Sequence, residues 1–182
     1  MSIENDNIGS SANQSEAESN SADSGQSPLT GGVLANMLLG EDEFVEPVSL
    51  LRDLTPNQAC GKPSNQLESI AQIVAHMQFW QNYSLRIIQG ERPHYPSSQV
   101  EKDGTWYQTE PSQWQELLSD FLSGLDSFMA LTESDAEISR PLGDDETVGD
   151  RVRWTAMHNA YHCGQIVLLR RMLGAWPPAG EA

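Results

Sequence analysis

Hydrophobic residues recur three and four positions apart over most of the chain after residue 28. This spacing is typical of helices that bury one face, whereas a half-buried strand would alternate apolar and polar residues. No segment alternates convincingly over the length of a strand. The pattern predicts four helices, which lie within 29–54, 67–90, 112–131 and 148–173. Four such helices favour an all-α fold, a four-helix bundle.

Small and polar residues predict where these helices begin and end. Ser64 or Asn65 is a candidate N-cap of the second helix, and Ser112 is a candidate N-cap of the third. Gly90 and Gly174 are expected to end the second and the last helix, because glycine tolerates the backbone conformation that follows a helix. The limits of the first helix stay open, since a glycine and a proline interrupt its pattern.

A long loop, residues 91–111, joins the second predicted helix to the third. It contains three prolines and no consistent period. It also contains Tyr95, Trp106 and Tyr107, which a freely solvated loop does not need. Loops of this length are usually functional or mobile. We expect this loop to pack across one end of the bundle.

The first 28 residues differ in composition from the rest. They contain acids but no lysine, arginine or aromatic residue. Such a segment cannot bury enough apolar area to offset the entropy of ordering it. It also lacks the basic start and apolar stretch of a secretory signal. We therefore expect 1–28 to be a disordered acidic tail and 29–178 to be the folded domain.

The formal net charge of −16 excludes several classes of partner. An acidic surface repels phosphate backbones, so we expect no nucleic-acid binding. No run approaches the roughly 18 apolar residues of a membrane span, so we expect no membrane association. Two cysteines are too few for a disulfide framework, which predicts a reducing, cytoplasmic setting.

The last predicted helix carries two histidines, His158 and His162, four residues apart. Residues at this spacing lie on one side of a helix, so two imidazoles could converge on one metal ion. A helical wheel places His158 within the apolar face and His162 on its flank, with Gln165 also directed inward. The spacing alone leaves two interpretations open, buried core histidines or metal ligands. The wheel builds the apolar face from Trp154, Met157, Tyr161, Leu168 and Met172.

A third histidine, His76, lies at the edge of the apolar face of the second helix. From that position it could face the last helix, which strengthens the metal interpretation without deciding it. His94 lies in the loop between prolines, and we expect it to be an ordinary loop residue. Cys163 points about 100° away from His162 around the helix and is expected to be a buried or interfacial cysteine. Cys60 has no partner that the sequence identifies.

Two segments, SIAQIVAHMQFWQ and HNAYHCGQIVLLRRMLGAWP, resemble the DinB-like (YfiT-like) superfamily of four-helix proteins. The resemblance covers roughly 29–178. It implies that His76, His158 and His162 bind one divalent metal, commonly zinc or nickel, and that the chain forms a homodimer. Some members transfer low-molecular-weight thiols such as bacillithiol or mycothiol, whereas others resemble metal-dependent hydrolases.

These observations lead to a functional hypothesis. A metal held by three histidines keeps a coordination position open, where it activates a thiol or water against a small electrophilic substrate. Trp80, Trp106 and Tyr161 would wall the pocket, and Gln165 would bond an imidazole or the substrate. The competing hypothesis is a non-catalytic, stress-related protein in which a metal stabilises the bundle or a partner-binding surface. The sequence does not decide whether the protein is an enzyme.

Overall fold

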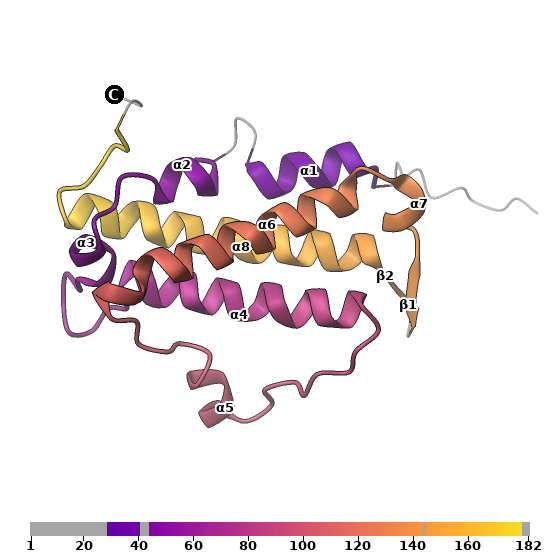
Figure 1. Cartoon of the computed structure of the whole chain (residues 1–182), viewed down its shortest axis with the longest axis horizontal. Coiled ribbons are helices and arrows are strands. Elements are labelled where there is room, and N and C mark those ends of the chain that lie inside the picture. The colour runs from indigo at the N-terminus through magenta and orange to yellow at the C-terminus, as the bar shows by residue number, and fades with distance from the viewer. Residues whose placement is uncertain (1–28, 41–43, 144, 180–182) are drawn as a thin grey trace, which may run out of the picture.

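The computed structural model describes residues 29–40, 44–143 and 145–179, and these form a helical bundle (Figure 1). α4 packs against both α6 and α8, and α1 packs against the same two helices. The predicted all-α, four-helix architecture is therefore confirmed. The main helices are α1 (Gly31–Leu39), α4 (Ile70–Ile88), α6 (Trp114–Thr132) and α8 (Val148–Met172).

The first predicted helix, 29–54, is two helices in the structure. α1 ends at Leu39 and is capped by Gly40, whose φ of 83° is left-handed, and α2 (Pro47–Leu51) begins on a proline. Proline suits the first position of a helix because its missing N–H has no partner there. The connection that follows contains a further short helix, α3 (Pro56–Cys60). Helical spacing continues across these breaks, which is why the pattern did not separate them.

The ends of the long helices test the predicted caps. Ser69, and neither Ser64 nor Asn65, caps α4 through a reciprocal pair of hydrogen bonds with Gln72. Ser112 does not cap α6, because it lies inside a 3₁₀ turn, Pro111–Gln113, that leads into the helix. The two predicted C-terminal glycines are confirmed: Gly90 and Gly174 follow α4 and α8 with φ of 89° and 68°.

The loop at 91–111 runs along the length of α4, so the expectation that it packs across one end of the bundle is wrong (Figure 1). It contains a short helix, α5 (Gln99–Asp103). The loop lies on α4 because the Trp106 carbonyl accepts a hydrogen bond from Gln72 and the Tyr107 hydroxyl donates one to Gln78. The next connection contains α7 (Asp135–Ile138) and a small antiparallel pair, β1 (Pro141–Gly143) and β2 (Glu146–Thr147), where no strand was expected.

The buried face of α8 differs from the face that the wheel predicted. The five residues assigned to that face are 43–67 % exposed. The face that packs into the bundle carries apolar side chains together with Thr155, Asn159 and Arg170, all of which are buried. A wheel weighted by hydrophobicity places such polar residues outside, so it rotated the helix toward the wrong side. The exposed five are Trp154, Met157, Tyr161, Leu168 and Met172.

One prediction falls on residues that the structure does not describe, and another concerns membranes. The predicted disordered tail, 1–28, lies outside the described residues, and so does 41–43 within the first connection. None of the described helices combines the length and the apolar character that crossing a membrane requires.

Candidate metal centre

Three histidines from two helices meet where α4 and α8 face each other. His76 comes from α4, and His158 and His162 come from adjacent turns of α8. The Nε2 atom of His158 lies 3.3 Å from that of His76 and 3.1 Å from that of His162. The structure thus brings together the three histidines that the sequence analysis selected, across a separation of more than 80 positions along the chain.

The burial of the His158 and His162 rings follows from the orientation that α8 has in the structure. His162 is buried at 3 % exposure beside core residues, and His158 is only half-buried. The wheel had placed them the other way round, with His158 inside and His162 on the flank. Both rings still lie on the side of α8 that faces α4, because residues four apart stack on one side of a helix.

The second nitrogen of two rings has a polar partner. The Nδ1 atom of His162 lies 2.7 Å from the side-chain carbonyl oxygen (Oε1) of Gln165. The side-chain amide nitrogen of Gln165 (Nε2) donates to the Tyr161 hydroxyl. A carbonyl oxygen only accepts, so His162 carries its hydrogen on Nδ1 and directs an Nε2 lone pair at the other histidines. The Nδ1 atom of His76 lies 2.7 Å from Oγ1 of Thr105.

Burial keeps these imidazoles neutral. Desolvation, with repulsion from His162 and His158, lowers the pKa of His76 to about 3. Desolvation and the neighbouring His162 lower the pKa of His158 to about 4, and desolvation also lowers the pKa of His162. At neutral pH all three rings are therefore in the form that donates a lone pair to a metal.

Two of the three nitrogen–nitrogen distances fit a divalent ion, and the three ligand nitrogens all lie within 4.8 Å of one another. Bonds of about 2.0–2.1 Å separate two nitrogen ligands by about 2.8–3.4 Å when the angle between them lies between a right angle and the tetrahedral one. The observed 3.1 and 3.3 Å fall within that range. Three converging neutral nitrogens repel one another unless a cation or a proton lies between them. The arrangement of these donor atoms therefore favours a bound positive charge.

Aromatic rings cover the two more accessible imidazoles. Trp106 stacks on His76 with ring centroids 3.8 Å apart and planes 11° apart. Trp154 stacks on His158 in the same way, with centroids 5.3 Å apart and planes 7° apart. The sequence analysis predicted Trp106 as a wall but assigned Trp154 to the helix core. Stacked rings restrict rotation of the imidazoles and exclude water from their faces.

Two further predicted wall residues contact the histidines edge-on. The Trp80 ring lies 6.3 Å from that of His76 and 6.5 Å from that of His158. The Tyr161 ring lies 5.0 Å from that of His162. With Trp106 and Gln165, all four residues that the sequence analysis named as pocket candidates surround the histidines.

A cavity of about 300 Å³ lies beside this group. Trp106 and Gln165, which contact His76 and His162, belong to its wall. The rest of the wall is largely apolar and includes Leu67, Ile73, Leu168 and Leu169. A volume of this size suits a small organic molecule.

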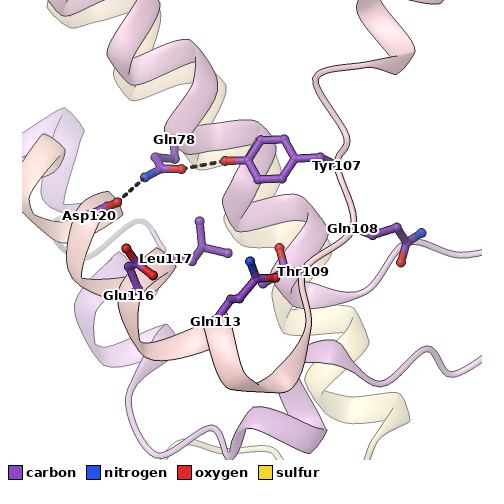
Figure 2. Close-up of a pocket in the computed structure, with 8 residues that line it drawn as sticks. All are labelled: Gln78, Tyr107, Gln108, Thr109, Gln113, Glu116, Leu117 and Asp120. Atoms are coloured by element: carbon purple, nitrogen blue, oxygen red, sulfur yellow. Dashed lines mark hydrogen bonds between the residues drawn. The ribbon is translucent and has the colours of Figure 1, made fainter.

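A second cavity, of about 260 Å³, lies between the loop, α4 and α6 and has a largely polar wall (Figure 2). Tyr107 donates to Gln78 at 2.7 Å, and Gln78 donates to Asp120 at 3.2 Å. Figure 2 shows this chain of contacts linking the loop to α4 and α6. None of the three histidines lines either cavity, but only the first has wall residues, Trp106 and Gln165, that contact them. The contacts of the second cavity fix the segment that precedes α6.

The remaining histidine and the cysteines stand apart from this group. His94 is exposed and bonds Glu101 at 2.7 Å, as expected of a loop residue. Cys163 lies in the apolar core, where burial raises the pKa of its thiol to about 12. Burial, with a smaller effect of Glu110, also raises the pKa of the Cys60 thiol. Among the described residues, the one group suited to hold a metal consists of three histidines and no cysteine or carboxylate.

Comparison with known protein families gives a match that covers most of the chain. A family model described as the DinB superfamily matches residues 47–166, from α2 to the second half of α8, and the match includes all three histidines. The chain belongs to the DinB superfamily. No curated protein and no solved structure matches it. This DinB protein therefore combines the fold of its superfamily with a three-histidine group that could hold a metal ion.

Proposed function

We propose that this DinB protein is a metal-dependent enzyme that transfers a low-molecular-weight thiol to a small electrophilic substrate. The observation that carries the proposal is the convergence of three neutral imidazole nitrogens, two of whose contacts are 3.1 and 3.3 Å long. Nε2 of His76, His158 and His162 would hold one divalent metal, with zinc and nickel the expected ions. Imidazole ligands suit both metals.

The charge of the ligand set supports catalysis over a purely structural role. Three neutral ligands would leave the full double charge of a bound metal uncompensated and would leave a position for a further ligand. The metal would supply a Lewis acid that stabilises an anion such as a thiolate at that position. Structural zinc sites instead have four protein ligands, often including thiolates.

The absence of a carboxylate from the described ligand group favours a thiol over water as the nucleophile. A thiol, with an ordinary pKa near 8.5, needs only the metal to become a thiolate at neutral pH. Water starts from a far higher pKa, and metal-dependent hydrolases commonly add a carboxylate base. Hydrolysis at the same site remains the second outcome that the activity screen below distinguishes.

The thiol would come from a separate small molecule. Cys163 is 2 % exposed and its thiol has a raised pKa, so it does not serve as the nucleophile. The cavity walled by Trp106 and several leucines would accept the apolar part of the electrophile. Both cysteines are free, which supports a reducing, cytoplasmic setting in which such thiols are abundant.

Metal content tests the first half of the proposal. Protein purified without a histidine tag is expected to hold about one zinc or nickel ion per chain, and His158→Ala is expected to lose it. His94→Ala is the matched control, because it removes an exposed imidazole away from the group. Less than about 0.1 metal per chain in the unmodified protein, after attempted reconstitution, contradicts the metal site.

An activity screen tests the second half. Metal-loaded protein is incubated with cellular thiols and small electrophiles, and thioether formation and hydrolysis are both measured. We expect thioether formation that falls at least about 100-fold in His158→Ala and is unchanged in His94→Ala. Metal-dependent hydrolysis without thioether would replace the transferase by a hydrolase. If no turnover occurs and His158→Ala only lowers the melting temperature, the metal is structural.

We also propose that two copies of the chain pair through the exposed apolar side of α8. The residues concerned are adjacent to the metal centre, since Trp154 and Tyr161 both contact its histidines.

A further inference from the structure

The loop residue Thr105 contacts the metal centre from outside the two helices that supply the ligands. It is 1 % exposed, and its Oγ1 lies 2.7 Å from Nδ1 of His76. The sequence analysis did not select it, because it lies in a loop without a period and belongs to no recognisable motif. An inference about its role rests on the metal site proposed above.

A second hydrogen bond fixes the direction of the first. The Thr105 hydroxyl donates its single hydrogen to the carbonyl oxygen of Lys102 at 2.7 Å. Toward His76 the hydroxyl oxygen can therefore only accept, and His76 must carry its hydrogen on Nδ1. Nε2 of His76 is then left with a lone pair, which faces Nε2 of His158 at 3.3 Å.

The surrounding contacts hold Thr105 in place. α5 begins with a capping box between Ser98 and Glu101, and its last turn ends in a backbone bond from Thr105 to Lys102. The next residue, Trp106, stacks on the face of the His76 ring. The same short segment of the loop therefore contacts both the Nδ1 edge and one face of the His76 imidazole, and so fixes the orientation of the ring. Because Thr105 is buried, water cannot readily replace its hydroxyl.

We propose that Thr105 is a positioning residue for the metal centre, which holds His76 in the tautomer and orientation that leave Nε2 free to bind the ion. Partners of the second imidazole nitrogen act in this way in metal sites, and their loss typically weakens metal binding about 10–100-fold. Through this bond the loop at 91–111 becomes part of the metal centre.

Three variants separate this role from general loosening of the loop. Thr105→Val keeps the shape of the side chain but removes the hydroxyl, whereas Thr105→Ser keeps the hydroxyl. Tyr107→Phe is the matched control, because it removes the loop's bond to Gln78 and leaves the contact to His76 in place. Circular dichroism of each variant checks that the bundle is folded.

The tautomer is measured without metal. Long-range ¹H–¹⁵N spectra of metal-free protein labelled at histidine report which nitrogen carries the hydrogen, and His76→Gln assigns the signals of His76. We expect hydrogen on Nδ1 in the unmodified protein, in Thr105→Ser and in Tyr107→Phe. Thr105→Val is expected to show a mixture or hydrogen on Nε2. An unchanged tautomer in Thr105→Val overturns the proposal.

Metal affinity is measured by competition with a chelating dye. We expect the dissociation constant for zinc to rise about 10–100-fold in Thr105→Val and to change less than about threefold in Thr105→Ser and Tyr107→Phe. An equal loss in Tyr107→Phe and Thr105→Val would mean that the loop acts as a cover, and would overturn the role of the hydroxyl. If the unmodified protein binds no metal, the proposed function fails while the tautomer measurement still decides whether Thr105 orients His76.

Discussion

The buried guanidinium of Arg170 shows how single residues fix the C-terminal end of the bundle. Its side chain is 1 % exposed and donates to the carbonyl oxygens of Leu50, Arg52 and Ala175. It also forms an ion pair with Asp53 at 2.9 Å. A buried charge is tolerated only when its donors are all satisfied, so this network ties the end of α8 to the segment after α2.

The Asp53 carboxylate is the charged partner whose removal tests this network. Burial alone would raise its pKa, but hydrogen bonds from Ala179 and Arg170 and the nearby positive charges lower it below the ordinary value. Asp53→Asn keeps the volume and suits the left-handed backbone at this position, where φ is 63°. We expect the free energy of unfolding at pH 7 to fall by about 1–3 kcal/mol.

The same ion pair predicts a pH dependence. Because the folded-state pKa of Asp53 is lowered, its stabilisation is complete above the unfolded pKa of about 3.9 and is lost as pH falls through the folded pKa. The stability difference between the unmodified chain and Asp53→Asn should therefore be constant from pH 7 to 5 and shrink below about pH 4. Urea titrations measure it. Glu91→Gln, which breaks an exposed pair with Arg86, is the control and should change stability by less than about 1 kcal/mol.

At the scale of single residues, the sequence predicted the candidate metal ligands better than the residues that hold the structure around them in place. His158 and His162 could be selected because their spacing within one helix brings the two rings together. The buried role of Arg170 could not be predicted from the sequence, since its partner Asp53 lies 117 positions earlier and leaves no local signal. Thr105 was missed for the same reason, because its contact joins a loop to a helix 29 positions earlier.

At the scale of elements, α1 meets the end of α6 without room for a side chain. A Cβ on Gly31 would fall on the carbonyl oxygen of Thr132, whereas a Cβ on Gly32 would have nothing closer than 4.0 Å. The Gly31 amide also donates to Asp135 in α7 at 3.0 Å. Close approach of backbones is what requires glycine at the first of these two positions.

The two adjacent glycines give a matched pair of variants. Gly31→Ala is expected to destabilise the bundle by about 1–3 kcal/mol, because the rigid backbone of α6 must move to admit the methyl group. Gly32→Ala is expected to be neutral or to stabilise by up to about 1 kcal/mol, since alanine loses less entropy than glycine in a helix. Chemical denaturation followed by circular dichroism measures both. Equal effects of the two substitutions would contradict the close approach.

Periodicity predicted the elements that bury a continuous apolar stripe and failed where tertiary contacts decide. α4, α6 and α8 lie where the hydrophobic pattern placed them, to within a few residues at either end. The short helices α2, α3, α5 and α7 were not separated, because four or five residues are too few for a period. The orientation of α8 was wrong because its core side carries polar residues, and its exposed side carries aromatic ones.

At the scale of the whole molecule, that exposed side of α8 has the pattern of a helix-packing seam. Trp154, Tyr161 and Leu168 are seven residues apart, and Met157 and Gly164 interleave with them at spacings of three and four. This is the repeat with which one helix packs along another, yet these side chains are largely exposed and a Cβ on Gly164 would meet nothing within 4 Å. We call these five residues the α8 seam.

A second copy of the chain is the occupant that the seam fits. Antiparallel pairing about Gly164 would place Tyr161 of one copy near Leu168 of the other, so the stripe is complementary to itself, and glycine at the centre permits close approach. The chain carries 26 acidic residues, but α8 contains only one, Asp150, and the cap of the helix holds it. Repulsion between acidic groups of two copies is therefore low on this face.

Sedimentation velocity over a range of concentrations tests the dimer. We expect the unmodified chain to dimerise with a dissociation constant of about micromolar strength, as is common for interfaces of modest area. Met157→Lys and Leu168→Lys should each weaken association at least about tenfold, because a lysine in the seam must be desolvated. Val100→Lys, at a position that is 82 % exposed on α5, is the control and should leave the dimer intact.

The outcome also distinguishes the other possible occupant of the seam, residues 1–28. A chain that begins at residue 29 should dimerise as the full chain does if two seams pair with each other. A full chain that is monomeric at about 100 μM, and that dimerises only after this deletion, would assign the seam to the N-terminal segment instead. If both chains stay monomeric, or if the seam variants still dimerise, pairing through α8 is wrong.

Because Trp154 and Tyr161 belong to the seam and contact the histidines, a dimer that forms there should also slow exchange of the bound metal, and Met157→Lys should restore faster exchange.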